Sequence, residues 1–285
     1  MTPTTAPVVG SGSVATDFAS LWKTRIGSQA AVLQQMVELA PGTGTPLFLI
    51  HWTSGNVRFV RDFATAFNHG HPVYGFEATG LWNREEPLLA VPDVAACYLR
   101  QIRSVQPSGP YLLGGLCGGS QIAYEMATQL REAGEVVGPL TLVNAARGEL
   151  ATEPHLGLED VYELRLASLR RQFGTHDLVG DLSLVMGRMR ELRWIDDEAP
   201  AADFFWRQVL WAASMYAFLR CRLKPLDVPV NVFVAEESAA DPEVSWHDVA
   251  PLSRISVVKA VTSGQIMQSR GFIESMRHAF AQSAK

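Results

Sequence analysis

The sequence has few cysteines and no long apolar run. No stretch of about eighteen consecutive apolar residues occurs, so we expect no membrane span. The N-terminus also lacks the basic and then apolar segments of a secretion signal. The three cysteines, Cys97, Cys117 and Cys221, are odd in number and far apart, which excludes a disulfide framework and a zinc-type spacing. These absences favour a cytoplasmic location and predict no metal site.

The sequence also has no large excess of positive or negative charge. Charged residues make up 19% of the chain and the formal net charge is −5, with no basic cluster, so we expect no nucleic-acid partner and no membrane partner. Hydrophobic residues make up 47% of 285 residues, which is enough for one large domain with a substantial core. We read residues 1–20 as a flexible leader rich in Thr, Pro, Gly and Ser, and 21–285 as a single domain.

Short apolar runs alternate with longer amphipathic ones along most of the chain. This alternation predicts βαβ units, and therefore an α/β fold with a mostly parallel central sheet covered by helices on both faces. The predicted strands are 31–39, 46–51, 72–76, 111–116, 140–143, 228–235 and 255–261, and the predicted helices are 57–67, 91–105, 120–133 and 271–281.

The alternation stops between about 147 and 223, where the sequence is helical and rich in aromatic and aliphatic residues. An insertion this late in a parallel sheet is expected at the carboxyl ends of the strands, where α/β proteins bind ligands. We interpret it as a helical lid over an acyl or peptidyl channel, although a subdomain that only packs has the same pattern.

The most informative motif is Gly115-Leu116-Cys117-Gly118-Gly119, which lies between a predicted strand and a predicted helix. It has the G-x-C-x-G form of a nucleophile elbow with Cys in place of Ser. Glycines two positions on either side of the nucleophile relieve collisions in the tight turn. The helix N-terminus favours a thiolate and a developing oxyanion, and the Gly118 amide is a candidate oxyanion donor.

Four segments together resemble the thioesterase family of polyketide and nonribosomal peptide synthesis: PLFLIHWTSGNVRFVRDFA, HPVYGFEATGL, GPYLLGGLCGGSQIAYEMA and LTLVNAARG. The resemblance runs from about Gly44 to Ala281 and implies an α/β-hydrolase fold. It also implies a covalent acyl-enzyme, formed from a chain carried on the phosphopantetheine arm of an acyl or peptidyl carrier protein. No other cofactor is implied.

The resemblance also assigns roles to residues. Cys117 takes the serine position, and some members use Cys there, including stand-alone enzymes that form carbon–carbon bonds. The family's acid corresponds to Asn144 and its histidine to Gln265. Trp52 corresponds to the second oxyanion donor, through its backbone amide, and His51 to a histidine that often opens the oxyanion loop.

Two of the three triad positions therefore depart from the family. Gln265 cannot accept a proton, so water attack lacks a general base, which is commonly worth about 10²- to 10⁴-fold. A thiol is a few per cent ionised near neutral pH, so Cys117 can still attack a thioester. We expect cyclisation or acyl transfer and only slow hydrolysis.

Other side chains are candidates to line the site or to supply a base: His51, His247 in the loop before the last strand, Gln121 after the elbow, and Asp241. For His51, His247 and Asp241 a structural role is the leading interpretation. Two further hypotheses stay open: a degenerate protein that binds carrier or product without acyl chemistry, and a site that rearranges a substrate without using the thiol.

Overall fold

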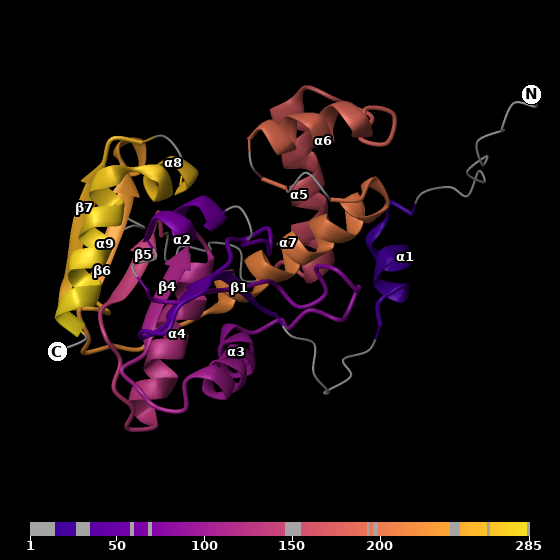
Figure 1. Ribbon diagram of the computed structural model, residues 1–285. Helices are drawn as coiled ribbons and strands as arrows, with labels where there is room; N and C mark the ends of the chain where they lie inside the picture. The colour runs from indigo at the N-terminus through magenta and orange to yellow at the C-terminus, as the bar shows by residue number, and fades with distance from the viewer. Residues whose placement is uncertain are drawn as a thin grey trace, which may run out of the picture.

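The computed structural model describes residues 15–26, 35–57, 60–67, 70–145, 155–192, 194–195, 199–239, 246–260 and 263–283. Seven strands form one sheet in the order β1-β3-β2-β4-β5-β6-β7, in which β1 is antiparallel to β3 and the other pairs are parallel. The strands are β1 (Met36–Ala40), β2 (Leu47–Ile50), β3 (Val73–Phe76), β4 (Leu112–Leu116), β5 (Leu140–Val143), β6 (Val230–Ala235) and β7 (Ser253–Val258). The predicted mostly parallel α/β architecture is confirmed (Figure 1).

Helices cover both faces of this sheet. They are α1 (Phe18–Lys23), α2 (Arg61–Phe67), α3 (Val91–Val105), α4 (Gly119–Glu132), α5 (Leu158–Phe173), α6 (Leu182–Glu191), α7 (Phe204–Arg220), α8 (Ser263–Gln268) and α9 (Arg270–Ser283), with short 3-10 turns η2 (Ala201–Asp203) and η3 (Glu236–Ser238). β2 shows why two layers are needed, because all four of its side chains are buried. Phe48 and Ile50 pack with α3 and α4, whereas Leu47 and Leu49 pack with α2 and α9.

Three helices, α5, α6 and α7, lie between β5 and β6 in the sequence and form a third core with α1. In Figure 1 they stand to one side of the sheet, with α6 farthest from the strands. The insertion predicted over about 147–223 contains these three helices, and its residues 147–154 lie outside the described part of the chain.

The N-terminal helix α1 begins within the segment predicted as a leader. Asp17 caps it by accepting the Ser20 amide, Phe18 stacks on Trp22, and Leu21 is buried. These contacts correct the leader's boundary at residue 20, because Phe18 and Leu21 already pack in the third core. The predicted helix over 57–67 is also shorter than expected, since α2 begins only at Arg61.

Candidate active site

Cys117 occupies the turn between β4 and α4. β4 lies in the middle of the sheet, between β2 and β5, and α4 begins at Gly119. The backbone of Cys117 has φ 51°, a left-handed conformation that non-glycine residues rarely adopt. Its amide donates to the Val143 carbonyl at 2.8 Å, which ties the turn to β5. The chain therefore holds this side chain out at the carboxyl edge of the sheet in a strained turn.

The glycines of the turn are required by close backbone approaches. A Cβ at Gly115 would collide with Ser120 Cα, and a Cβ at Gly119 would collide with the His51 carbonyl oxygen. These contacts confirm the steric reason that the G-x-C-x-G pattern predicted. Gly118 is equally restricted, because a Cβ there would meet the Phe218 ring of α7.

The Cys117 thiol is partly buried and has polar neighbours on one side. Thr53 Oγ1 lies 3.9 Å from Cys117 Sγ, and the Gly118 amide also hydrogen-bonds the sulfur. Burial raises the pKa of the Cys117 thiol, while the Thr53 and Gly118 hydrogen bonds oppose that rise. The expectation of an enriched thiolate is therefore not met: desolvation has a larger effect than the favourable polar contacts.

Of the two predicted oxyanion donors, the Gly118 amide lies beside the thiol, and Trp52 lines the same cavity. Trp52 follows β2, the strand that pairs with β4, and lines the same cavity as Cys117. The adjacent Thr53 contacts the sulfur, and the Gly118 amide is directed at it. Backbone amides at this place would face an oxyanion that develops next to Sγ.

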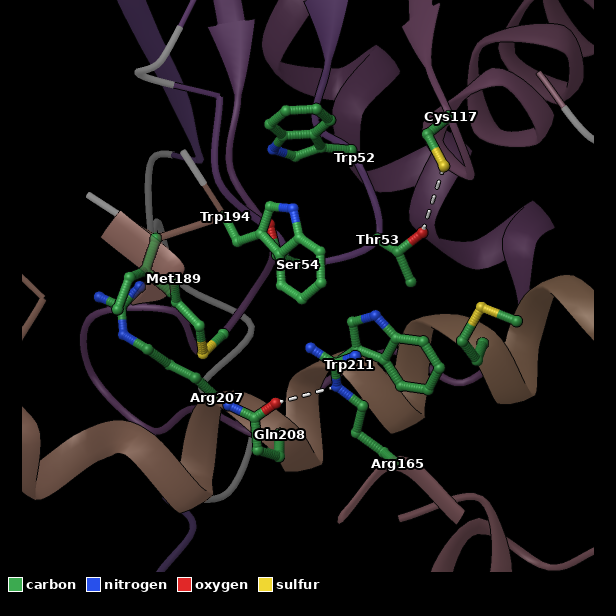
Figure 2. A pocket seen from close by; sticks show the side chains of 12 residues that line it. Trp52, Thr53, Ser54, Cys117, Arg165, Met189, Trp194, Arg207, Gln208 and Trp211 are labelled. Carbon is green, nitrogen blue, oxygen red and sulfur yellow. Dashed lines mark hydrogen bonds between the residues drawn. The ribbon is translucent and has the colours of Figure 1, made fainter. Parts of the chain in front are cut away.

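A cavity of about 350 Å³ opens from the thiol toward the helical insertion. Its lining is mainly aromatic and aliphatic and comes from the loop after β2 and from the helical insertion, as Figure 2 shows. The described lining residues are Trp52, Thr53, Ser54, Cys117, Arg165, Met189, Trp194, Ile195, Arg207, Gln208, Trp211 and Met215. Its size is at the lower end of small-molecule sites.

Asn144 lies at the end of β5, next to the elbow in space. It also has a positive φ, 50°, and its Oδ1 accepts the Ala235 amide at 3.4 Å. The backbone N–H of Asn144 in turn donates to the Phe233 carbonyl at 2.6 Å. Asn144 therefore joins β5 to β6 and is not among the described residues that line the cavity.

Gln265 lies in α8 with an exposed side chain, while the following Ile266 and Met267 are buried under the sheet. It too is absent from the described lining of the Cys117 cavity. Of the three triad positions that the resemblance assigned, Cys117 alone faces this cavity among the described residues.

His51 is buried, and its side chain lines a second, smaller cavity with Tyr98. Its Nδ1 lies 2.7 Å from the Trp52 carbonyl, which can only accept, so Nδ1 carries the hydrogen. Nε2 then lies 2.9 Å from the Tyr98 hydroxyl, whose single proton it shares with the Glu77 carbonyl at 3.2 Å. Burial lowers the pKa of His51 to about 4, which keeps the ring neutral. The ring fixes the Trp52 peptide and is not among the described residues that line the Cys117 cavity.

His247 is exposed and lies at the opposite edge of the sheet from Cys117. Its Nδ1 contacts Ser253 Oγ at 3.1 Å, and Ser253 begins β7 opposite Val230, the first residue of β6. This placement corrects the expectation that His247 lines the site, because a residue just before a parallel strand lies at its amino end. Gln121 is buried in α4 and is also absent from the described cavity lining, and Asp241 lies outside the described residues.

Sequence reasoning missed several residues of this cavity. Thr53 and Arg165 were not singled out, and neither were Arg207 and Gln208. A signal for the last two was present: they are polar residues in the first turns of a helix that is otherwise mostly apolar, and they share a face with Trp211.

Within the described residues, no cluster of three or more His, Cys, Asp or Glu side chains could hold a metal ion. A search of the same residues finds no helix with the length and apolar content that a membrane span requires.

A mostly parallel sheet with a cysteine on a strained strand–helix turn after its middle strand has the arrangement of an α/β-hydrolase fold. The Thioesterase domain family matches residues 45–248, so the chain belongs to the thioesterase domain family. The resemblance seen in the sequence is thereby confirmed.

The curated relatives are large synthases, and the region similar to this chain is a small part of each. The chain is 36% identical over 124 residues to a dimodular nonribosomal peptide synthase of Bacillus subtilis (strain 168), covering 43% of this chain and 5% of the relative. It is 27% identical over 202 residues to the non-reducing polyketide synthase atnG of Arthrinium sp, covering 70% of this chain and 9% of the relative. The chain thus spans less than a tenth of the length of these relatives.

Solved structures share the fold at low identity. One is the NocB thioesterase domain in covalent complex with a fluorophosphonate nocardicin G analog, with TM-score 0.60, 19% identity, and coverage of 85% of this chain and 95% of the other. Another is YbtT, a type II thioesterase from the yersiniabactin pathway, with TM-score 0.59, 18% identity, and coverage of 88% and 100%. At these identities the similarity supports the fold alone.

Proposed function

We propose that this protein is a thioesterase-like acyl-transfer enzyme of polyketide or nonribosomal peptide biosynthesis. The chain would arrive as a thioester on the phosphopantetheine arm of an acyl or peptidyl carrier protein and move to Cys117. The observation that carries the proposal is the thiol itself, held at φ 51° on the elbow, hydrogen-bonded by the Gly118 amide and open to an apolar cavity.

In the first step the Cys117 sulfur attacks the thioester carbonyl, and the new oxyanion accepts hydrogen bonds from the Gly118 and Trp52 amides. The carbon–sulfur bond to pantetheine then breaks. The departing thiolate takes up the proton that Cys117 has lost, so one thioester and one thiol become another thioester and another thiol. Such an exchange needs little proton management.

In the second step a nucleophile within the acyl chain, or on an acceptor molecule, attacks the acyl-enzyme. The Cys117 thiolate leaves and takes the proton from that nucleophile. Water is a poor competitor, because no histidine lines the described part of the cavity. Release by cyclisation or transfer is therefore favoured, and hydrolysis is slow.

Intact-mass measurement tests the proposal. The protein is incubated with an N-acetylcysteamine thioester of an aromatic acid, and the expected result is one added acyl group. Cys117→Ala should stay unmodified, whereas the matched Cys97→Ala variant, which removes a thiol on α3 outside the cavity, should be acylated like the unaltered protein. Absence of the adduct from the unaltered protein, or its persistence in Cys117→Ala, would overturn the proposal.

A second candidate is a site that binds or rearranges its substrate without acyl chemistry. It is favoured by one observation: burial raises the pKa of the Cys117 thiol and so lowers the thiolate population. This candidate predicts that turnover of the natural substrate survives in Cys117→Ala, whereas the acyl-enzyme route predicts its loss.

A further inference from the structure

The described lining of the acyl cavity carries charge of one sign. Its described lining includes two guanidinium groups, from Arg165 on α5 and Arg207 on α7, and no aspartate or glutamate. A cavity meant only for a neutral aliphatic chain has no need of buried cations, which are costly to desolvate. The positive charge of Arg165 in this lining therefore points to an anionic group in the occupant.

Arg165 is the better placed of the two. Its guanidinium lies over the Trp211 ring, with Cζ 4.6 Å from the ring centroid, and 5.9 Å from the centroid of Trp194. Nε donates to Gln208 Oε1 at 3.1 Å, and Gln208 is fixed by its own bond to the Phe204 carbonyl. Figure 2 shows the Arg165 guanidinium between Gln208 and Trp211, with its side chain reaching into the cavity.

The terminal nitrogens of Arg165 remain available. Stacking on Trp211 uses the face of the guanidinium and Gln208 uses Nε, so Nη1 and Nη2 have no hydrogen-bond partner in the described structure. No carboxylate is paired with Arg165 there either. Burial alone lowers the pKa of Arg165 to about 10, so the group stays charged at neutral pH.

We propose that Arg165 selects acyl chains that carry a planar, delocalised oxyanion, either a carboxylate or the enolate of a 1,3-dicarbonyl group. This inference rests on the proposed function, because it names the class of chain that the Cys117 cavity takes. The in-plane fork of a guanidinium matches two oxygens of such an anion.

The indole rings of the cavity indicate the shape of the rest of the acyl group. Trp52, Trp194 and Trp211 line the same 350 Å³ cavity, which suits a flat aromatic or conjugated body beside the anionic end. An enolate held by Arg165 would also be an internal nucleophile that is already deprotonated. Such a chain needs no histidine for its second step.

Binding to Cys117→Ala tests the inference without acyl chemistry. Titration calorimetry compares 2-naphthoate with neutral 2-naphthamide, and 4-hydroxycoumarin, an enolate at neutral pH, with neutral 4-methoxycoumarin. At least one anion should bind about tenfold or more tightly than its neutral partner. The arm with the larger ratio identifies carboxylate or enolate as the preferred oxyanion. Equal binding within both pairs would overturn the inference, and this comparison needs no change at Arg165.

Variants then locate the preference. In the Cys117→Ala background, Arg165→Gln should bring the anion-to-neutral affinity ratio close to one. Arg165→Lys should keep part of the preference for the anion. Arg188→Gln, at an exposed arginine on α6, is the matched control and should leave the ratio unchanged. A ratio that survives in folded Arg165→Gln would assign the selection elsewhere and overturn the role of Arg165.

The two proposals fail separately. Anion-selective binding in Cys117→Ala, with no acyl adduct on the unaltered protein, would leave the selectivity intact and remove the acyl-enzyme. An adduct without any anion preference would do the reverse.

Discussion

The hydroxyl of Thr53 lies 3.9 Å from the sulfur of Cys117, so the loop after β2 supplies a polar neighbour to the thiol that follows the adjacent strand β4. Burial raises the pKa of the Cys117 thiol, and the Thr53 hydrogen bond is the largest of the effects that oppose this rise. The reactivity of the thiol therefore depends on a residue outside the G-x-C-x-G motif.

Replacing Thr53 by Val keeps the shape and removes the hydroxyl. The thiolate then loses a donor, so the pKa of Cys117 should rise further and alkylation by iodoacetamide at pH 8 should slow several-fold. The pH profile of alkylation, followed by intact mass, should move toward higher pH. Thr53→Ser keeps a hydroxyl and should retain most of the rate. An unchanged profile in Thr53→Val would show that the hydroxyl does not reach the sulfur.

Gly119→Ala should be strongly destabilising. The new Cβ would collide with the His51 carbonyl oxygen, and overpacking of this kind costs about 1–3 kcal/mol. Gly187→Ala is a matched control on α6, where nothing lies within 4 Å of the new Cβ, and a helix-interior Gly→Ala change should stabilise by about 0.5–1 kcal/mol. Urea unfolding measures both changes, and equal effects would contradict the close approach.

Asn144→Ala should lower stability and spare acylation. Ala is unfavourable at φ 50°, and the hydrogen bond to the Ala235 amide is lost, for a combined cost of about 1–2 kcal/mol. Because Asn144 does not line the described cavity, the rate of Cys117 acylation should change by less than about threefold, a difference worth under ~1 kcal/mol. A much larger loss of acylation at unchanged stability would restore a catalytic role for Asn144.

The buried His51 should make the protein less stable in mild acid. Its pKa is about 4 when folded and ~6.5 when unfolded, so the unfolded chain binds the extra proton first. The stability contributed by neutral His51 is complete above pH 6.5. Between pH 6.5 and 4 it falls by up to about 1.4 kcal/mol per pH unit.

Urea unfolding at pH 7 and pH 5 measures this loss, expected to be about 2 kcal/mol. His51→Asn, whose amide can still donate to the Trp52 carbonyl, should lack most of the difference. A slope of equal size in this variant would assign it to other groups.

The fold was largely predictable because its signals are local. The helix at Val91–Val105 and the strand at Leu140–Val143 have the predicted bounds, since periodicity and a buried apolar run define each without reference to the rest of the chain. The position of α1 was not predictable from composition, because a Thr- and Pro-rich segment precedes it and its apolar residues are buried by α5 and α7.

The site was predictable only around the elbow. The residues from Gly115 to Gly119 form a contiguous motif, whereas Arg165 and Trp211 come from different helices and meet only through tertiary packing. For His247 the necessary rule was available: a residue just before a parallel strand lies at the amino ends of the strands, whereas Cys117 lies at their carboxyl ends. Applying it to the predicted strand over 255–261 would have removed His247 from the site.

The contact between Phe218 and Gly118 limits how far the elbow can adapt. Phe218 is buried near the C-terminal end of α7 and packs with the core of the sheet, directly over the elbow. The elbow is therefore held firmly against α7, whereas α6 contributes Met189 to the cavity, a flexible side chain that tolerates varied shapes. An occupant of the proposed acyl class would thus meet a rigid wall at the sulfur and an adaptable wall at α6.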